Sequence, residues 1–192
     1  MRLGLGIFGG SFDPIHNAHL VVAELAREQL GLDRVLFLVA GSQPLKQGKH
    51  HADSLDRAWM VSMAIEGVPG MAIDQRELDR PGPSYMVDTL RELAVEYPDH
   101  ELILLLGADA AEDFEEWREP EEIRRLARIA VFRRGQAPIP PGFDLEVAVP
   151  RLQLSSTDVR ARAAQQLPLV GWVTRDVADY IVVERLYGSN GA

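Results

Sequence analysis

Two glycines and two histidines near the N-terminus form the pattern in this chain that most clearly points to chemistry. The segment runs Gly9-Gly10-Ser11-Phe12-Asp13-Pro14-Ile15-His16-Asn17-Ala18-His19-Leu20. Glycines allow backbone N–H groups to approach a phosphate closely, and the N-terminus of a following helix favours negative charge. His16 and His19 are three residues apart, so in the first turn of a helix their imidazoles project from one face. The segment therefore predicts a phosphate site in which imidazoles stabilise the charge of a transition state.

Other interpretations of these residues stay open at this point. Paired histidines on a helix are also common as surface or core residues without a ligand. A zinc site would need a third ligand, for which His50 and His51 are available in a loop. Gly4, Gly6 and Gly9 spell the dinucleotide-binding pattern G-x-G-x-x-G, but the first two lie inside a predicted strand and no acidic residue ends the second strand. Close packing explains these glycines better.

The elements that must position this segment alternate between strands and helices. Apolar runs typical of buried strands cover 3–8, 35–39, 71–73, 102–106, 128–132 and 145–149. Helices are predicted between or after these strands. One ends at Gly31, and others begin near Ser84, Pro120 and Ser155. Two more are marked by apolar stripes, one of Leu55, Ala58, Trp59, Ser62 and Met63 and a final one of Val177, Tyr180 and Ile181. The alternation predicts an α/β, Rossmann-like fold, a mostly parallel sheet with helices on both faces, in which ligands bind at the carboxyl ends of strands.

Length and composition limit the class of protein. A chain of 192 residues predicts a single domain over 1–192. The net charge of −9 disfavours general binding of nucleic acid, and the absence of cysteine excludes disulfides, thiolate metal sites and a cysteine nucleophile. No apolar run reaches the length of a membrane span, and residues 1–8 show no signal-peptide profile. We therefore expect a cytoplasmic protein that binds neither nucleic acid nor membranes.

The segment from Gly9 to Leu20 resembles the signature of bacterial nicotinate-nucleotide adenylyltransferases, a family of the (H/T)-x-G-H nucleotidyltransferase superfamily. The family pattern is close to G-G-T/S-F-D-P-x-H-x-G-H-L, from which this chain departs at Ala18, where glycine is usual. A methyl group there narrows the approach of the ATP phosphates but leaves both imidazoles in place. The resemblance continues over nearly the whole chain.

Further motifs of the family recur after later strands. Gln43-Pro44-Leu45-Lys46 resembles a Pro-Pro-His-Lys loop, which implies a phosphate contact for Lys46 and, because leucine replaces histidine, no third catalytic histidine. Pro83-Ser84-Tyr85-Met86-Val87-Asp88-Thr89-Leu90 resembles P-S-Y-T-x-D-T-L, which implies that Ser84, Tyr85 and Met86 lie beside the nicotinate ring and offer backbone donors to its carboxylate. Without the resemblance, Lys46 is a solvated lysine and Ser84 caps a helix.

Three more matches complete the implied site. Gly107 and Asp109 correspond to the family's G-x-D near the adenosine, where a carboxylate accepts from ribose hydroxyls, although Asp109 also suits a helix N-cap. Trp117 corresponds to a tryptophan that stacks near the pyridine ring, or packs in the core. The run Ser155, Ser156, Thr157 and Arg160 corresponds to I-S-S-T-x-I-R, which implies a second anion site at what is otherwise an ordinary capped helix.

The resemblance implies transfer of AMP from ATP to nicotinate mononucleotide, by direct attack without a covalent intermediate. It implies catalytic roles for His16, His19, Lys46 and Arg160, and ATP contacts from the backbone of Gly9, Gly10, Ser11 and Phe12. Mg²⁺ is expected on the leaving phosphates, held by substrate oxygens and water without a protein metal site. A pantetheine-phosphate adenylyltransferase, an enzyme that prefers or also accepts the nicotinamide substrate, and a non-catalytic nucleotide-binding module remain alternatives. Oligomeric state is left open.

Overall fold

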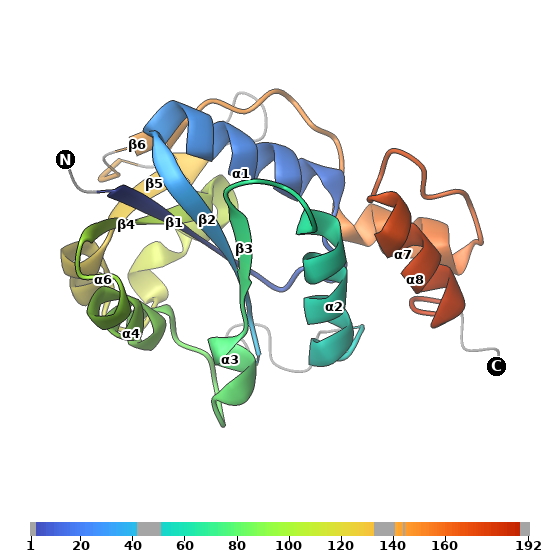
Figure 1. The fold of residues 1–192 in the computed structure, drawn as a ribbon, viewed down its shortest axis with the longest axis horizontal. Coiled ribbons are helices and arrows are strands. Elements are labelled where there is room, and N and C mark those ends of the chain that lie inside the picture. Colours follow the sequence, from blue (N-terminus) through green and yellow to red (C-terminus); the bar gives the residue numbers. More distant parts are fainter. Residues whose placement is uncertain (1–2, 42–50, 133–140, 144, 189–192) are drawn as a thin grey trace.

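A computed structural model describes residues 3–41, 51–132, 141–143 and 145–188 of the chain (Figure 1). The strands are β1 (Leu3–Gly10), β2 (Leu32–Val39), β3 (Met71–Asp74), β4 (His100–Gly107), β5 (Arg128–Phe132) and β6 (Leu145–Val147). They form a six-stranded sheet in the order β3-β2-β1-β4-β5-β6, and every pair of neighbours is parallel. The strand order reverses between β1 and β4, which is the point where doubly wound sheets bind ligands. The predicted α/β, Rossmann-like fold is confirmed.

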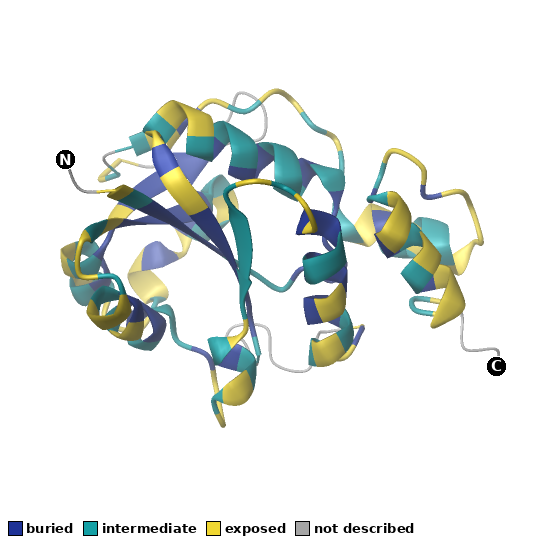
Figure 2. Cartoon of the chain, viewed as in Figure 1, coloured by how far each residue is buried: buried dark blue, intermediate teal, exposed yellow. Residues whose placement is uncertain are grey.

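Helices cover both faces of the sheet. They are α1 (Asn17–Leu30), α2 (Ser54–Ile65), α3 (Arg76–Asp79), α4 (Met86–Glu96), α5 (Ala108–Glu112), a 3-10 helix (Phe114–Glu116), α6 (Pro120–Leu126), α7 (Ser156–Ala164) and α8 (Arg175–Val183). Along β4, Ile103 and Leu105 pack with α1 and α2, whereas Leu102, Leu104 and Leu106 pack with α4 and α6. Because side chains of a strand alternate between faces, a sheet covered on both sides needs apolar residues at every position. Figure 2 shows the central strands as almost continuously buried.

Close contact between β1 and β2 explains the early glycines. A Cβ atom on Gly4 or Gly6 would lie 2.9 or 2.8 Å from a methyl group of Leu32. Both glycines lie inside β1, so they allow close packing rather than phosphate binding, as expected. The strand also runs two residues further than predicted: Gly9 and Gly10 pair with Leu38 and Val39 of β2. The loop that follows the strand therefore begins at Ser11.

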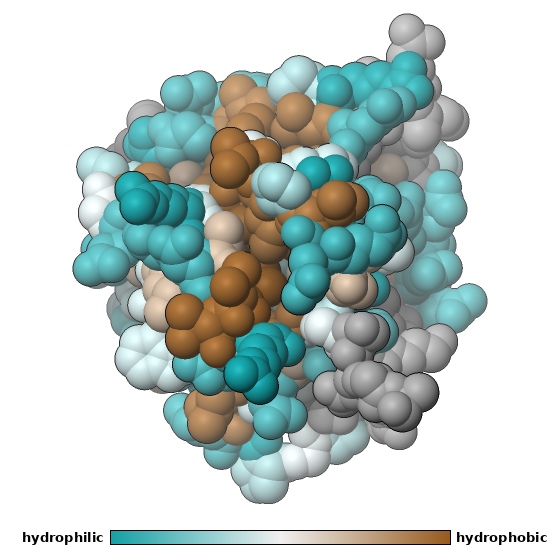
Figure 3. All heavy atoms as spheres, turned by 90° about the vertical axis from the view of Figure 1, so that its right-hand side faces the viewer, coloured by the Kyte–Doolittle hydropathy of each residue, from teal (hydrophilic) through white to brown (hydrophobic). Residues whose placement is uncertain are grey.

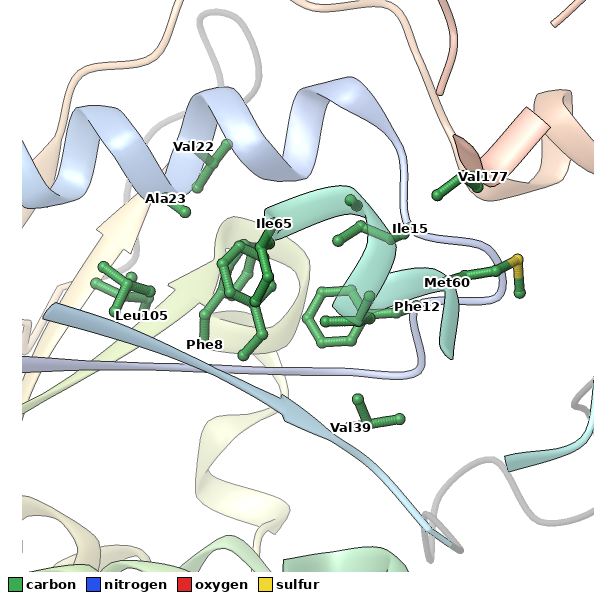
Figure 4. Close-up of a cluster of buried hydrophobic side chains, with 14 of the residues drawn as sticks. Phe8, Phe12, Ile15, Val22, Ala23, Val39, Met60, Ile65, Leu105 and Val177 are labelled. Atoms are coloured by element: carbon green, nitrogen blue, oxygen red, sulfur yellow. The ribbon is translucent and has the colours of Figure 1, made fainter. Parts of the chain in front are cut away.

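The buried face of α2 matches the predicted one only in part. Leu55 and Trp59, placed on the apolar stripe, are 66% and 58% exposed. Ala58 of the predicted stripe is buried as expected, and the helix also buries Met60, Val61, Ala64 and Ile65, together with Arg57. Apolar residues surround most of this helix, so periodicity alone did not identify the face that packs on the sheet. Ile65 lies beside the ring of Phe8, whereas the side chain of Met60 points away from Phe12 at the edge of the same buried cluster (Figure 4).

Several helix boundaries follow from local chemistry. Pro120 occupies the first turn of α6, and Ser155 is the N-cap of α7, both as predicted. The helix expected near Ser84 begins at Met86, with Tyr85 as its N-cap residue. The short helices α3 and α5 and the 3-10 helix were not predicted, because hydrophobic periodicity needs longer segments.

The face that carries α7 and α8 is the one turned toward the viewer in Figure 3. Apolar side chains gather in its centre, with hydrophilic residues around them. Val182 and Val183 of α8 are among the large apolar residues that are exposed. Within the described part of the chain, no helix is both long and apolar enough to cross a membrane.

Candidate active site

A cleft of about 830 Å³ opens at the carboxyl ends of the strands. Its floor includes Gly9 and Gly10 of β1, Ala40 after β2, Gly107 of β4 and Phe132 of β5. This volume suits a small-molecule ligand, and the position matches the switch point between β1 and β4. The residues described next come from segments that meet at its walls.

The two histidines lie together at the start of α1. His16 is the N-cap residue of this helix, and its ring stacks on that of His19 with centroids 3.7 Å apart and planes 15° apart. Nδ1 of His19 accepts a hydrogen bond from the backbone N–H of His16 at 3.2 Å. The ring proton of neutral His19 must then be on Nε2, which is therefore the ring's donor. His19 lines the cleft, whereas His16 is 2% exposed and lies outside the lining.

Aromatic rings pack around Phe12 in the loop after β1. Phe12 has a left-handed backbone with φ of 46°, which is uncommon for a residue other than glycine. Its buried ring lies near that of Phe8 (Figure 4) and packs against it edge-to-face at 5.6 Å. It packs in the same way against His19 at 5.1 Å. A Cβ atom on Gly10 would lie 3.0 Å from the Phe12 ring. Glycine at this position therefore allows Phe12 to fold back over the strand end.

A buried arginine that the sequence analysis missed supports the same loop. Nη1 of Arg57 donates to the carbonyl oxygen of Ser11 at 2.7 Å and to that of Ala40 at 2.9 Å. The side chain is 1% exposed, and burial lowers the pKa of Arg57, an effect that the nearby Asp13 carboxylate opposes. Arg57 thus joins the loop after β1 to the end of β2. Its place in an amphipathic helix gave no sign of burial.

Asp13 connects the loop to two distant segments. Its carboxylate accepts hydrogen bonds from the backbone N–H groups of His51 at 2.7 Å and Ala52 at 3.2 Å. It also accepts from the hydroxyl of Tyr187 at 2.8 Å. Burial and the Asp13 carboxylate raise the pKa of Tyr187, so this hydroxyl keeps its proton and remains a donor.

The N-terminus of α7 docks on the same loop and forms the wall beside it. The Ser155 hydroxyl accepts from the backbone N–H of Asp158 at 3.2 Å, which caps the helix as predicted. The Ser156 hydroxyl donates to the carbonyl oxygen of Pro14 at 2.9 Å. Nη1 of Arg160 donates to the carbonyl oxygen of Asp13 at 2.7 Å. Ser156, Thr157 and Arg160 line the cleft, so the two expected anion sites lie at one place.

The start of α4 and the segment before α6 form another wall. Ser84, Tyr85, Met86, Trp117 and Arg118 all line the cleft. The Arg118 guanidinium lies over the Tyr85 ring, 4.7 Å from its centroid. Trp117 is half-buried and packs against Phe114 at 5.5 Å, so it belongs partly to the core as well as to the cleft. The residues implied for the pyridine ring are thus brought together.

Two acidic residues on the cleft differ in their surroundings. Asp109 is exposed in the first turn of α5, whose N-cap residue is Gly107, so the N-cap interpretation of Asp109 was wrong. Glu77, which the sequence analysis missed, is buried and accepts a hydrogen bond from the Thr89 hydroxyl at 2.9 Å. Burial raises the pKa of Glu77, against the opposing effect of that hydrogen bond. No local pattern marked it, because its burial depends on contacts between α3 and α4.

The remaining expectations concern residues beyond these walls. Lys46 lies outside the described residues, as do the rest of its loop and His50. Over residues 3–41, 51–132, 141–143 and 145–188, no group of three or more histidine, aspartate or glutamate side chains is placed to hold a metal ion.

Comparison with known proteins gives a consistent result. The model of the cytidylyltransferase-like family matches residues 7–162. A probable nicotinate-nucleotide adenylyltransferase from Thermus thermophilus is 43% identical over 195 residues, covering 97% of this chain and 100% of the relative. Another, from Thermomicrobium roseum, is 41% identical over 200 residues, covering 95% and 91%.

Solved structures share the fold. One is the Plasmodium falciparum nicotinic acid mononucleotide adenylyltransferase complexed with NaAD, with a TM-score of 0.77 over 97% of this chain and 98% of that one. Its sequence identity is 19%, so this likeness concerns the fold alone.

Proposed function

Because this chain belongs to the cytidylyltransferase-like family and, within it, to the nicotinate-nucleotide adenylyltransferases, we propose that it transfers AMP from ATP to nicotinate mononucleotide. The products are nicotinate adenine dinucleotide and pyrophosphate. The observation that carries the proposal is the composition of one cleft, which unites the β1 loop, the N-terminus of α7 and the wall of Tyr85 and Trp117. A site for phosphates and a site for a flat ring are what the two substrates require.

The reaction proceeds by direct transfer in this proposal. A phosphate oxygen of the mononucleotide attacks the α-phosphorus of ATP, the new P–O bond forms, and the bond to the β-phosphate oxygen breaks to release pyrophosphate. The chain has no cysteine, and neither the sequence nor the cleft suggests an activated nucleophile for a covalent intermediate. Alignment of the reacting groups and stabilisation of charge then provide the rate.

The chain's own residues have distinct parts in this mechanism. His19 donates from Nε2 to an α- or β-phosphate oxygen, and the stacked His16 fixes the orientation of its ring. Arg160, whose guanidinium is held by Asp13 and Thr157, provides positive charge beside the same phosphates. Backbone groups from Gly9 to Phe12 and the hydroxyls of Ser156 and Thr157 complete the phosphate contacts, and Lys46 adds a further cation. Ser155 contributes by capping α7.

The other substrate groups are assigned to the remaining walls. Gly107 and Asp109 receive the adenosine, where the exposed Asp109 carboxylate accepts from ribose hydroxyls. Ser84, Tyr85 and Met86 border the pyridine ring and Trp117 stacks on it, since an indole face suits a flat, electron-poor ring.

Mg²⁺ is expected to enter this site bound to the phosphates of ATP. The described carboxylates of the cleft are not grouped as a metal-binding set, so phosphate oxygens and water would hold most of its coordination positions. When bound, it offsets negative charge on the leaving pyrophosphate.

The test is to incubate the protein with ATP and MgCl₂ and to measure pyrophosphate after adding one acceptor at a time. We expect rapid release with nicotinate mononucleotide, much slower release with nicotinamide mononucleotide and none with phosphopantetheine. Equal rates with the first two would indicate a dual-specificity enzyme. No release above background with any acceptor would contradict the proposal and favour a nucleotide-binding module.

A further inference from the structure

Two arginines line the cleft on different walls. Among the described residues of the lining, the arginines are Arg118 and Arg160. Arg160 belongs to α7 and lies against the phosphate-binding loop, whereas Arg118 precedes α6 and lies against Tyr85 at the start of α4. Figure 1 shows α7 and the pair α4 and α6 on opposite sides of the molecule. The cleft therefore has positive charge at two separate places.

The proposed acceptor also has two separate anionic groups. Nicotinate mononucleotide carries a phosphate at one end and a ring carboxylate at the other, while the amide analogue has the phosphate alone. We propose that the side chain of Arg118 is a specificity-determining group that favours the acid by attracting its ring carboxylate. This inference rests on the proposed function, and it adds a charged side chain to the backbone donors that the family resemblance implies.

Several acidic residues line the same cleft as Arg118. Carboxyl groups that also line the cleft come from Asp13, Glu77, Asp109, Asp113 and Glu116, in a chain of net charge −9. A second negative group on the ligand meets repulsion from these residues unless a positive group lies near it. Arg118 lies next to Trp117 and over Tyr85, two residues assigned to the pyridine ring.

The geometry of Arg118 suits a planar carboxylate. The guanidinium carbon lies over the Tyr85 ring, 4.7 Å from its centroid, so a cation–π contact holds the planar group beside this residue. Its ion pairs are long and use one nitrogen each, Nη1 to Asp88 at 3.4 Å and Nε to Glu119 at 3.6 Å. Neither acid forms the two-pronged pair that arginine makes with a carboxylate, so this mode of binding remains open to a ligand. The side chain is 50% exposed, which lets it contact a molecule in the cleft.

Arg91 provides a matched control. It pairs with the same two acids, Asp88 at 3.2 Å and Glu119, but it does not line the cleft. Replacing either arginine therefore removes a positive charge from the same ion-pair group. Only Arg118 is placed to contact the acceptor.

The experiment measures kcat/KM for nicotinate and nicotinamide mononucleotides at saturating ATP and MgCl₂, in the wild type and in Arg118→Ala, Arg118→Lys and Arg91→Ala. For Arg118→Ala we expect about a tenfold fall with the acid, mainly through KM, and less than about a twofold change with the amide. Arg118→Lys keeps the positive charge and should retain part of the preference for the acid over the amide. Arg91→Ala should retain the whole of this preference. The preference of the wild type should weaken with added salt, because the group is half exposed.

Two outcomes would overturn the inference. An acid-to-amide ratio that Arg118→Ala leaves unchanged, including an equal fall for both substrates, would show that the side chain does not select between them. An equal loss of preference in Arg91→Ala would assign the effect to the ion-pair group as a whole. An active wild type whose acid-to-amide ratio survives Arg118→Ala refutes this inference alone, whereas a wild type inactive with both substrates refutes the proposed function as well.

Discussion

Replacing Arg57 with methionine removes a buried guanidinium while keeping a long apolar side chain in its place. The change eliminates two short hydrogen bonds, of 2.7 and 2.9 Å to the carbonyl oxygens of Ser11 and Ala40, and a longer one of 3.5 Å to that of Gly41. A hydrogen bond from a charged donor contributes about 1.5–3 kcal/mol, so the two short bonds amount to about 3 kcal/mol at the lower end of that range. The variant recovers part of the cost of burying a charge but leaves buried carbonyl oxygens without these donors. We expect the free energy of unfolding to fall by about 2–3 kcal/mol.

The measurement is urea unfolding followed by circular dichroism, together with the KM for ATP. The KM should rise several-fold, because Ser11 belongs to the loop assigned to the ATP phosphates. Arg27→Met is the control: Arg27 is partly exposed on α1 and pairs with Glu24, so its loss should change stability by less than about 0.5 kcal/mol. A stability of Arg57→Met within that same margin, with an unchanged KM for ATP, would refute the role given to Arg57.

Three further predictions concern other parts of the site. Burial raises the pKa of Glu77, so the contribution of this group to stability is present at low pH and lost as the pH rises through the folded-state pKa. The free energy of unfolding of Glu77→Gln should therefore match that of the wild type near pH 4 and exceed it increasingly toward pH 8. A difference independent of pH would contradict this cause. Ser155→Ala removes the N-cap bond to Asp158 and should cost about 1 kcal/mol in chemical denaturation, whereas an unchanged midpoint would count against the cap. Tyr187→Phe removes the hydroxyl that donates to Asp13 and should lower the free energy of unfolding by about 1–2 kcal/mol in the same measurement. An unchanged free energy would contradict a stabilising role for this hydrogen bond.

The sequence predicted those parts of the fold that depend on local patterns. Continuous apolar runs predicted the strands because both faces of this sheet are covered, and Pro120 and Ser155 predicted helix starts because proline and serine satisfy the geometry of a first turn. The buried face of α2 was predicted correctly at Ala58 but wrongly at Leu55 and Trp59, because apolar residues surround most of this helix. The face that packs inward also contains Arg57. Local spacing does not reveal a charged residue whose partners are carbonyl groups of distant loops.

The same division applies to the candidate site. Its motifs were visible because each lies directly after a strand or at a helix start, and the parallel sheet brings such positions to one edge. The contacts that assemble them were not visible: Arg160 reaches the carbonyl oxygen of Asp13 across 147 residues of sequence, and Tyr187 reaches the Asp13 carboxylate across 174. Nothing in the sequence distinguishes Arg118 from an ordinary surface arginine. Its role at the cleft is visible only from the structure, where it lies over Tyr85.

The central claim is that this cleft, with His19 on its wall, transfers AMP between the two substrates. Turnover of His19→Ala with ATP, MgCl₂ and nicotinate mononucleotide tests it most directly, with circular dichroism to verify that the variant is folded. Loss of one preorganised donor to the phosphates should lower kcat by about two to three orders of magnitude relative to the wild type. A folded His19→Ala protein that forms nicotinate adenine dinucleotide at the wild-type rate would contradict the account.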